Sequence, residues 1–108
     1  KYAKIILNPD KGLTDATEIT SEDEYALLFY EYKDELFDSV IEKSTIAINK
    51  HEGEKIVSKF ELLKAYAIGK KDGILAFKEA LDFVAMNYPN TEEGKKALEV
   101  IETIKTKI

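Results

Sequence analysis

Apolar residues recur along this chain at the spacing of one face of a helix. The first stripe is Tyr25, Leu28, Phe29 and Tyr32, at positions i, i+3, i+4 and i+7, which is the pattern of an amphipathic helix. Similar stripes run through residues 37–48, 56–69, 74–88 and 97–108. No stretch alternates between apolar and polar residues as a half-buried strand does. The pattern therefore predicts an all-α protein.

Local signals place the starts of two of these helices. Ser21 is followed three residues later by Glu24, and Asn90 by Glu93, which is the spacing of a capping box. We therefore predict that one helix begins at Ser21 and that the last helix begins next to Asn90.

The ends of the helices are also marked. The first stripe breaks around residues 33–36, Gly53 ends the second, Asp72 and Gly73 form a turn, and Pro89 follows the fourth. Glycine and proline commonly end helices in this way. The connections between successive helices are thus predicted to be short.

The third stripe differs from the others because it has apolar residues on two sides. One side carries Ile56, Phe60, Leu63 and Ala67, and the other carries Leu62, Ala65, Tyr66 and Gly69. A helix that is apolar on two sides is expected to pack between neighbours.

The stripes repeat with an offset of 37 residues. Tyr25, Leu28, Phe29 and Tyr32 superpose on Leu62, Ala65, Tyr66 and Gly69, while Phe37, Val40, Ser44, Ala47 and Ile48 superpose on Ile74, Phe77, Leu81, Val84 and Ala85. Such a period predicts helical hairpins that bury their faces by stacking. We expect a right-handed α-α superhelix of about five to six helices, forming one domain that is a fragment of a larger protein. Its parts are hairpins over 21–53 and 56–89, a capping helix over 90–108, and over 1–20 the end of a preceding helix followed by an acidic loop.

A period near 37, small residues at the hairpin contacts and a proline after the second helix resemble tetratricopeptide repeats. The run KFELLKAYAIG and the ending NYPNTEEGKKALEVIE also resemble the C-terminal repeat region of the gliding-motility and type IX secretion lipoproteins of Bacteroidetes, of the SprE or PorW type. The first unit departs from the tetratricopeptide pattern, because it has large residues at small positions and Glu52 in place of the closing proline. The resemblance implies a protein on the periplasmic face of the outer membrane that links secretion components. A cytoplasmic adaptor is the alternative.

Composition excludes several classes of site. The chain has no Cys, one His and sixteen basic residues that are all Lys, and its formal net charge is −5. Disulfides and thiolate zinc sites are therefore absent, and nucleic acid is not an expected partner because its binding depends on a basic surface. The longest apolar run, six residues at 25–30, is too short for this segment to insert into a membrane.

The sequence offers no catalytic constellation, and we expect neither enzymatic activity nor a cofactor or metal. His51 follows the second stripe, where a capping or surface role is expected. Ser44 lies on an apolar stripe, so its hydroxyl is expected to bond back to its own helix. The acidic stretch at 10–24 lacks the glycine and the closing glutamate of a calcium-binding loop. This loop is interpreted as solvated, with partner binding as the alternative.

We expect this protein to bind another protein or a peptide. By analogy with tetratricopeptide arrays, a groove is predicted from two helices: Asp23, Ala26, Tyr30 and Lys33 from the first, and Phe60, Leu63, Ala67, Lys70 and Lys71 from the third. An aromatic residue with a polar tip is a common interface anchor. Tyr30 packing against Phe60 or Leu63 remains the alternative. A different function is a purely structural spacer, which would self-associate through its exposed repeat ends.

Overall fold

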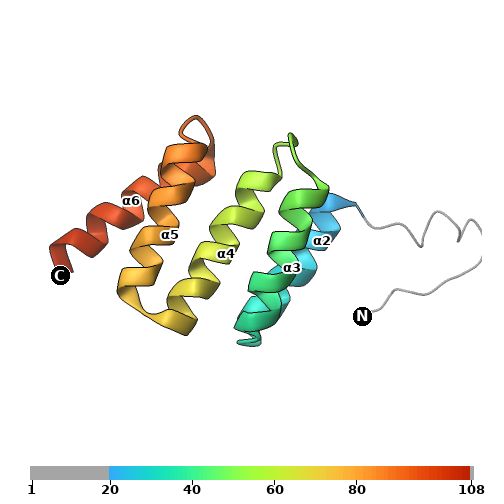
Figure 1. Cartoon of the computed structure of the whole chain (residues 1–108), viewed down its shortest axis with the longest axis horizontal. Helices are drawn as coiled ribbons and strands as arrows, with labels where there is room; N and C mark the ends of the chain where they lie inside the picture. Colours follow the sequence, from blue (N-terminus) through green and yellow to red (C-terminus); the bar gives the residue numbers. More distant parts are fainter. Residues whose placement is uncertain (1–19, 108) are drawn as a thin grey trace, which may run out of the picture.

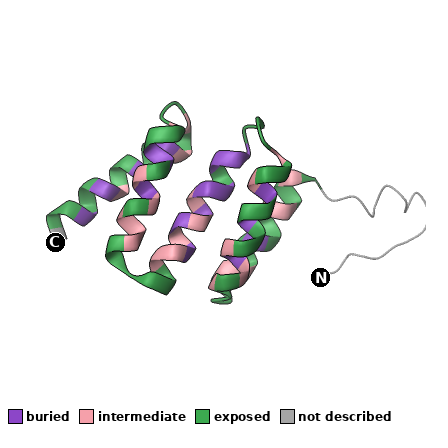
Figure 2. Cartoon of the chain, in the orientation of Figure 1, coloured by how far each residue is buried: buried purple, intermediate pink, exposed green. Residues whose placement is uncertain are grey.

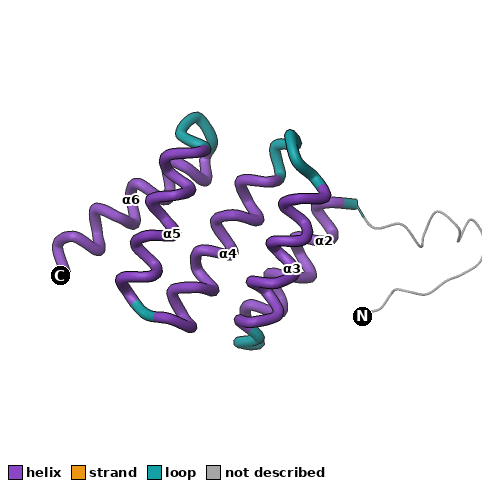
Figure 3. Tube along the Cα trace, in the orientation of Figure 1, coloured by secondary structure: helices purple, strands orange, loops and turns teal. Residues whose placement is uncertain are grey.

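A computed structural model describes residues 20–107, and the predicted helix end and acidic loop over 1–20 lie outside these residues apart from Thr20. The described part consists of helices joined by short connections and contains no strand (Figures 1 and 3). The helices are α2 (Ser21–Lys33), α3 (Phe37–Lys50), α4 (Val57–Asp72), α5 (Ile74–Asn87) and α6 (Glu92–Lys107). The prediction of an all-α fold built from adjacent helical hairpins is confirmed.

The helices form two rows. Each helix packs against the next one in the chain, and α4 also contacts both α2 and α6. Within the described residues no Cα atom of α3 lies within 8 Å of a Cα atom of α5. Helices α2, α4 and α6 therefore form one row and α3 and α5 the other, with α4 in the centre (Figure 1).

Helix α4 separates two apolar cores. The first contains Leu28, Val40, Ala47, Ile56, Phe60, Leu63 and Ala67. The second contains Ala65, Leu81, Val84, Ala85, Ala97, Ile101 and Ile104. The prediction that this helix packs between neighbours is confirmed. Its buried residues lie between Val57 and Ala67, whereas residues 68–72 at its C-terminal end are not buried (Figure 2).

The offset of 37 residues is kept in the helix boundaries. Helix α3 spans Phe37–Lys50, and a shift of 37 carries both of its ends onto those of α5, Ile74–Asn87. The corresponding shift places the start of α2 one residue after the start of α4. Equivalent positions in the two hairpins can therefore be compared directly.

Both helix caps lie one residue from the predicted position. Helix α2 begins at Ser21 as expected, but Thr20 caps it by accepting a hydrogen bond from the Asp23 amide at 3.1 Å. At α6 the Thr91 hydroxyl accepts from the Gly94 amide at 2.9 Å. The capping boxes predicted from Ser21 and Asn90 are wrong in register, because a threonine next to each satisfies the free amides of the first turn instead.

Two glycines allow the close packing of α4 on α5. Gly73, at φ 100°, is the only residue between these helices, and its positive φ is one that glycine adopts without strain. A Cβ at Gly69 would lie 2.7 Å from the ring of Phe77. The missing side chain therefore sets the distance between the two helices.

Candidate protein-binding surfaces

Three residues of the predicted groove lie in the core. Phe60, Leu63 and Ala67 are 0%, 3% and 0% exposed, because the α2–α3 hairpin covers this side of α4. They are closed to a partner protein, and the prediction that they line a groove is wrong. The apolar side of α4 that suggested a binding surface is the interface between the two hairpins.

The equivalent positions on α2 are Asp23, Ala26 and Tyr30, each 37 residues earlier, and all three are exposed. Helix geometry puts them on the side of α2 turned away from α4. Tyr30 is 63% exposed, so the alternative that it packs against Phe60 or Leu63 is also wrong. Tyr25 takes that place, with its ring centroid 5.9 Å from that of Phe60.

Of the three remaining predicted residues, Lys33 and Lys70 lie at equivalent positions on α2 and α4 and are exposed. Lys33 Nζ is 5.6 Å from the centroid of Phe29, and Lys59 Nζ reaches from α4 to 5.8 Å from the centroid of Tyr25. Such ammonium–aromatic contacts are weakly attractive. We call the surface formed by Phe29, Lys33, Lys59, Tyr66 and Lys70 the α2–α4 face.

Sequence reasoning missed Phe29, Lys59 and Tyr66 on this face. The offset of 37 residues could have revealed part of this face, because it relates Phe29 to Tyr66 and Lys33 to Lys70. A pocket of about 220 Å³ opens beside the face. Its lining consists of Tyr32, Tyr66, Gly69, Lys70, Ile74 and Phe77.

Charge on the α2–α4 face is positive, although the whole chain is acidic. Within residues 20–106, Lys33, Lys59 and Lys70 make no ion pair with a carboxylate. Lys71 differs, because its ammonium lies 2.8 Å from Asp38, and this hydrogen bond raises the pKa of Lys71. Among the described residues, these three lysines therefore have no carboxylate partner, whereas Lys71 is engaged by α3.

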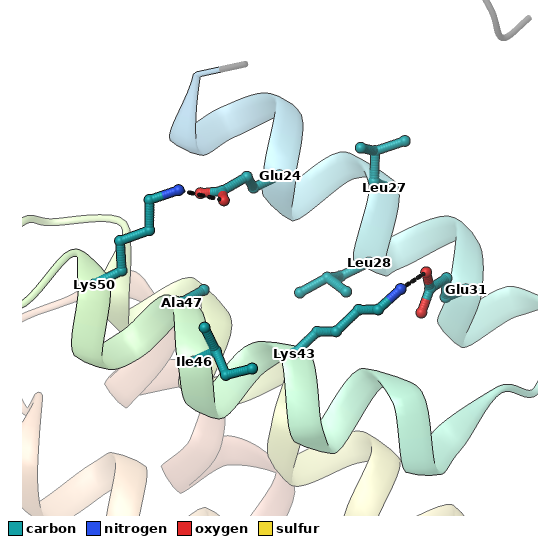
Figure 4. Close-up of a pocket in the computed structure, with 8 residues that line it drawn as sticks. All are labelled: Glu24, Leu27, Leu28, Glu31, Lys43, Ile46, Ala47 and Lys50. Atoms are coloured by element: carbon teal, nitrogen blue, oxygen red, sulfur yellow. Dashed lines mark hydrogen bonds and ion pairs between the residues drawn. The ribbon is translucent and has the colours of Figure 1, made fainter. Parts of the chain in front are cut away.

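A second surface is the groove between α2 and α3, of about 250 Å³. Ion pairs bracket it at both ends: Lys50 lies 3.0 Å from Glu24, and Lys43 lies 2.8 Å from Glu31 (Figure 4). Between the ion pairs lie Leu27, Leu28, Ile46 and Ala47. Leu27 and Ile46 are 48% and 59% exposed, so we name this surface the α2–α3 groove.

His51 joins α2 to the connection between α3 and α4. His51 is the C-cap residue of α3, and its backbone amide donates to the carbonyl of Ala47. Its side chain is only 12% exposed, with Nε2 2.5 Å from Glu24 and Nδ1 3.3 Å from Glu54. The ring also stacks on Phe60, with centroids 6.1 Å apart. Both ring nitrogens thus face carboxylate oxygens, an arrangement that favours the imidazolium.

The two carboxylates change the titration of this cluster. The hydrogen bond to Glu24, with a further one to Glu54, raises the pKa of His51. Burial acts to raise the pKa of Glu24, but the hydrogen bonds from His51 and Lys50 outweigh it and lower that pKa. His51 is therefore protonated over a wider pH range in the folded protein than in the unfolded chain.

Replacing His51 by Gln is expected to lower stability by about 1 kcal/mol at pH 6 and by much less at pH 8.5. A group whose pKa is raised by folding stabilises below its unfolded pKa and loses that effect as pH rises through the folded value. Urea unfolding at the two pH values measures the difference. As a control, Lys50→Gln removes the other partner of Glu24 and should lower stability by the same amount at both pH values. Equal losses for His51→Gln at both pH values would show that the imidazolium contributes nothing.

The described residues contain no cluster of three or more His, Cys, Asp and Glu side chains able to hold a metal ion. Ser44 is fully buried on α3, and its hydroxyl has no hydrogen-bond partner. The predicted bond back to its own helix is therefore not made. Over residues 20–107, no helix has the length and apolar character needed to cross a bilayer.

No family model and no curated protein matches this chain.

Proposed function

We propose that this protein is a non-enzymatic helical-repeat scaffold that binds another protein or a peptide on its α2–α4 face. The observation that carries the proposal is the set of three lysines without carboxylate partners among the described residues, each close to an aromatic side chain. Lys33 lies over the ring of Phe29 and Lys59 over that of Tyr25, while Lys70 lines a pocket together with Tyr66. Phe29 is 40% exposed. Aromatic and cationic groups that stay accessible on one surface are typical of interaction sites.

The same residues indicate the chemistry of the partner. An ammonium group gains most from a carboxylate, and an exposed ring gains most from an apolar side chain. The pocket beside Tyr66 is lined by Tyr32, Ile74 and Phe77 and would accept one such side chain. The partner is thus a segment that alternates acidic and apolar residues.

Reversing two charges tests the α2–α4 face. The probe is an array of fluorescent 12-residue peptides that carry Glu or Asp and one Leu or Phe. Lys33→Glu with Lys70→Glu is expected to weaken the tightest binder at least about tenfold, because each reversal replaces an attraction with a repulsion and 1.4 kcal/mol is tenfold. The dissociation constant is measured by fluorescence anisotropy.

The matched control is Lys95→Glu with Lys96→Glu, two exposed lysines on α6 whose reversal changes the net charge equally. Tyr30→Ala serves as a second control, on the other side of α2. If both double variants weaken binding equally, net charge explains the loss and the α2–α4 face is not the site. If binding survives Lys33→Glu with Lys70→Glu, the α2–α4 face is likewise overturned as the site.

The cellular setting is proposed from the resemblance alone. Similarity to tetratricopeptide repeats and to the SprE or PorW type of gliding-motility and type IX secretion lipoproteins supports a role in outer-membrane-associated secretion machinery, on the periplasmic face. Fractionation of cells that produce the full-length gene product tests this. Recovery with the outer membrane supports the role, whereas recovery in the cytoplasm supports an adaptor there.

A purely structural spacer is the second candidate, and exposed apolar residues favour it. Leu75 and Met86 on α5 are 68% and 80% exposed. A spacer would associate through such surfaces and would bind none of the acidic peptides. Sedimentation of the purified protein over a range of concentrations, together with the peptide array, distinguishes the two functions.

A further inference from the structure

A hollow of about 280 Å³ lies on α4 between α3 and α5. Its apolar lining includes Ile48, Ile68 and Phe83, and its one carboxylate belongs to Glu61. We call this surface the α3–α5 groove. Helix geometry puts it on the opposite side of α4 from the α2–α4 face, so an inference about the groove does not depend on the proposed function.

Glu61 is a buried carboxylate without an ion-pair partner among the described residues. The residue is only 8% exposed, and its Oε2 accepts a hydrogen bond from the neutral hydroxyl of Tyr88 at 3.3 Å. Burial raises the pKa of Glu61, although the charge of Lys64 and the Tyr88 hydroxyl act to lower it. A buried charge is costly unless it is paired, so a cation that reached Glu61 would be bound favourably.

In the first hairpin the equivalent carboxylate is paired with two basic side chains. Glu24 stands 37 residues before Glu61. It contacts the Lys50 ammonium at 3.0 Å and the His51 ring on its other oxygen (Figure 4). The same shift replaces these two basic residues by neutral ones, Asn87 and Tyr88. The second hairpin therefore keeps the carboxylate but lacks the cations that pair with it.

We propose that the α3–α5 groove binds a lysine side chain of a partner peptide, with the lysine ammonium on Glu61 as Lys50 is on Glu24. An ammonium has three donors, and among the described residues only Tyr88 donates to this carboxylate. The methylene stem of a lysine gains from apolar surface, which Ile68 and Phe83 provide. Phe83 is 50% exposed, so its ring is open to a cation as well.

The groove continues beyond the space for one side chain. A second hollow, of about 420 Å³, shares Ile48 and Asn49 with the first and is also lined by Tyr88. Its charged residues are Glu52, Glu54 and Lys55, so acidic groups outnumber basic ones there. A surface of this extent accepts the residues that flank the lysine in a peptide. The ligand is therefore a lysine-containing segment and not a free amine.

Removing the charge of Glu61 tests the proposal. The probe is an array of fluorescent 12-residue peptides that each carry one Lys among Ala, Leu and Ser, and fluorescence anisotropy gives the dissociation constant of the tightest binder. Glu61→Gln keeps the shape of the side chain and is expected to weaken binding at least about tenfold. Norleucine in place of the peptide's lysine should weaken binding by a similar factor.

The matched control is Glu102→Gln on α6, where the side chain is 72% exposed. It changes the net charge equally and should alter the dissociation constant by no more than about twofold. Circular dichroism checks that each variant is folded.

A second variant supplies the missing cation from the protein itself. Asn87 is exposed and is the equivalent of Lys50, so Asn87→Lys is expected to place an ammonium on Glu61 and to weaken the same peptide at least about fivefold. Its control is Thr103→Lys, an exposed position on α6 that adds the same charge. This test does not require Glu61 to be changed, and it decides the matter even if Glu61→Gln does not fold.

Unchanged affinity in folded Glu61→Gln or in Asn87→Lys would overturn the proposal. Equal weakening by a variant and its control would also overturn it, because net charge would then explain the loss. The same holds if no peptide of the array binds, or if n-butylammonium chloride binds as tightly as the best peptide, since the site would then take a free amine.

Discussion

Replacing Phe60 by alanine is expected to lower the free energy of unfolding by about 4 kcal/mol. Phe60 is fully buried in the first core, and its ring contacts those of Tyr25 and His51. The change removes a large apolar side chain at the point where α2, α4 and the α3–α4 connection meet, so it leaves a cavity that no single neighbour can fill. Urea unfolding followed by circular dichroism measures the loss. A domain of this size has a total stability of about 5–15 kcal/mol.

Two variants separate this effect from a role in binding. Phe60→Leu keeps most of the apolar volume and should cost about 1.5 kcal/mol or less. Tyr30→Ala, at a 63% exposed position, should change stability by no more than about 0.5 kcal/mol. A Phe60→Ala protein with unchanged stability and lost peptide binding would contradict the burial of Phe60 and restore the groove predicted from the sequence.

The helices were predictable because their signals are local. Stripes at 3.6-residue spacing located them, and the two apolar sides of α4 correctly implied neighbours on both sides. The predicted groove was wrong for a different reason. An offset of 37 shows that Ala26 and Leu63 occupy equivalent positions, but it does not show that only Leu63 is covered by a preceding hairpin. Exposure depends on the neighbour as well as on the position within the repeat.

Contacts between residues far apart in the sequence were also beyond prediction. Nothing local pairs His51 with Glu24, 27 residues away, yet they form the 2.5 Å contact that connects α2 to the α3–α4 turn. The predicted capping residue of α2 was wrong by one position. Thr20 and Ser21 are both good capping residues, and only the backbone conformation selects between them. Ser44 was correctly placed on a buried stripe, but its missing hydrogen bond depends on side-chain geometry.

Replacing Gly94 by alanine is expected to cost about 3 kcal/mol of stability, although alanine favours helix over glycine by about 1 kcal/mol. The cause is the turn between α5 and α6, which folds over the first turn of α6. An alanine Cβ would meet the backbone carbonyl oxygen of Tyr88 at a distance no pair of unbonded atoms can adopt. That oxygen also accepts hydrogen bonds from the hydroxyl of Thr91 at 2.7 Å and from its amide at 3.2 Å. Chemical denaturation gives the change in stability directly.

The size of the stability loss shows whether it comes from the helix cap or from the contact with the Tyr88 carbonyl, because other variants test the cap and the glycine conformation separately. Thr91→Ala deletes the cap on the Gly94 amide and should cost about 1 kcal/mol. Gly53→Ala meets no atom within 4 Å and is strained only by its positive φ, so it should also cost about 1 kcal/mol. Gly94→Ala should exceed both, since the turn must move as a unit and α6 then loses its position over Ala65 and Leu81 in the second core. A stabilising Gly94→Ala would mean that helix propensity alone governs this site and that the turn does not pack against α6.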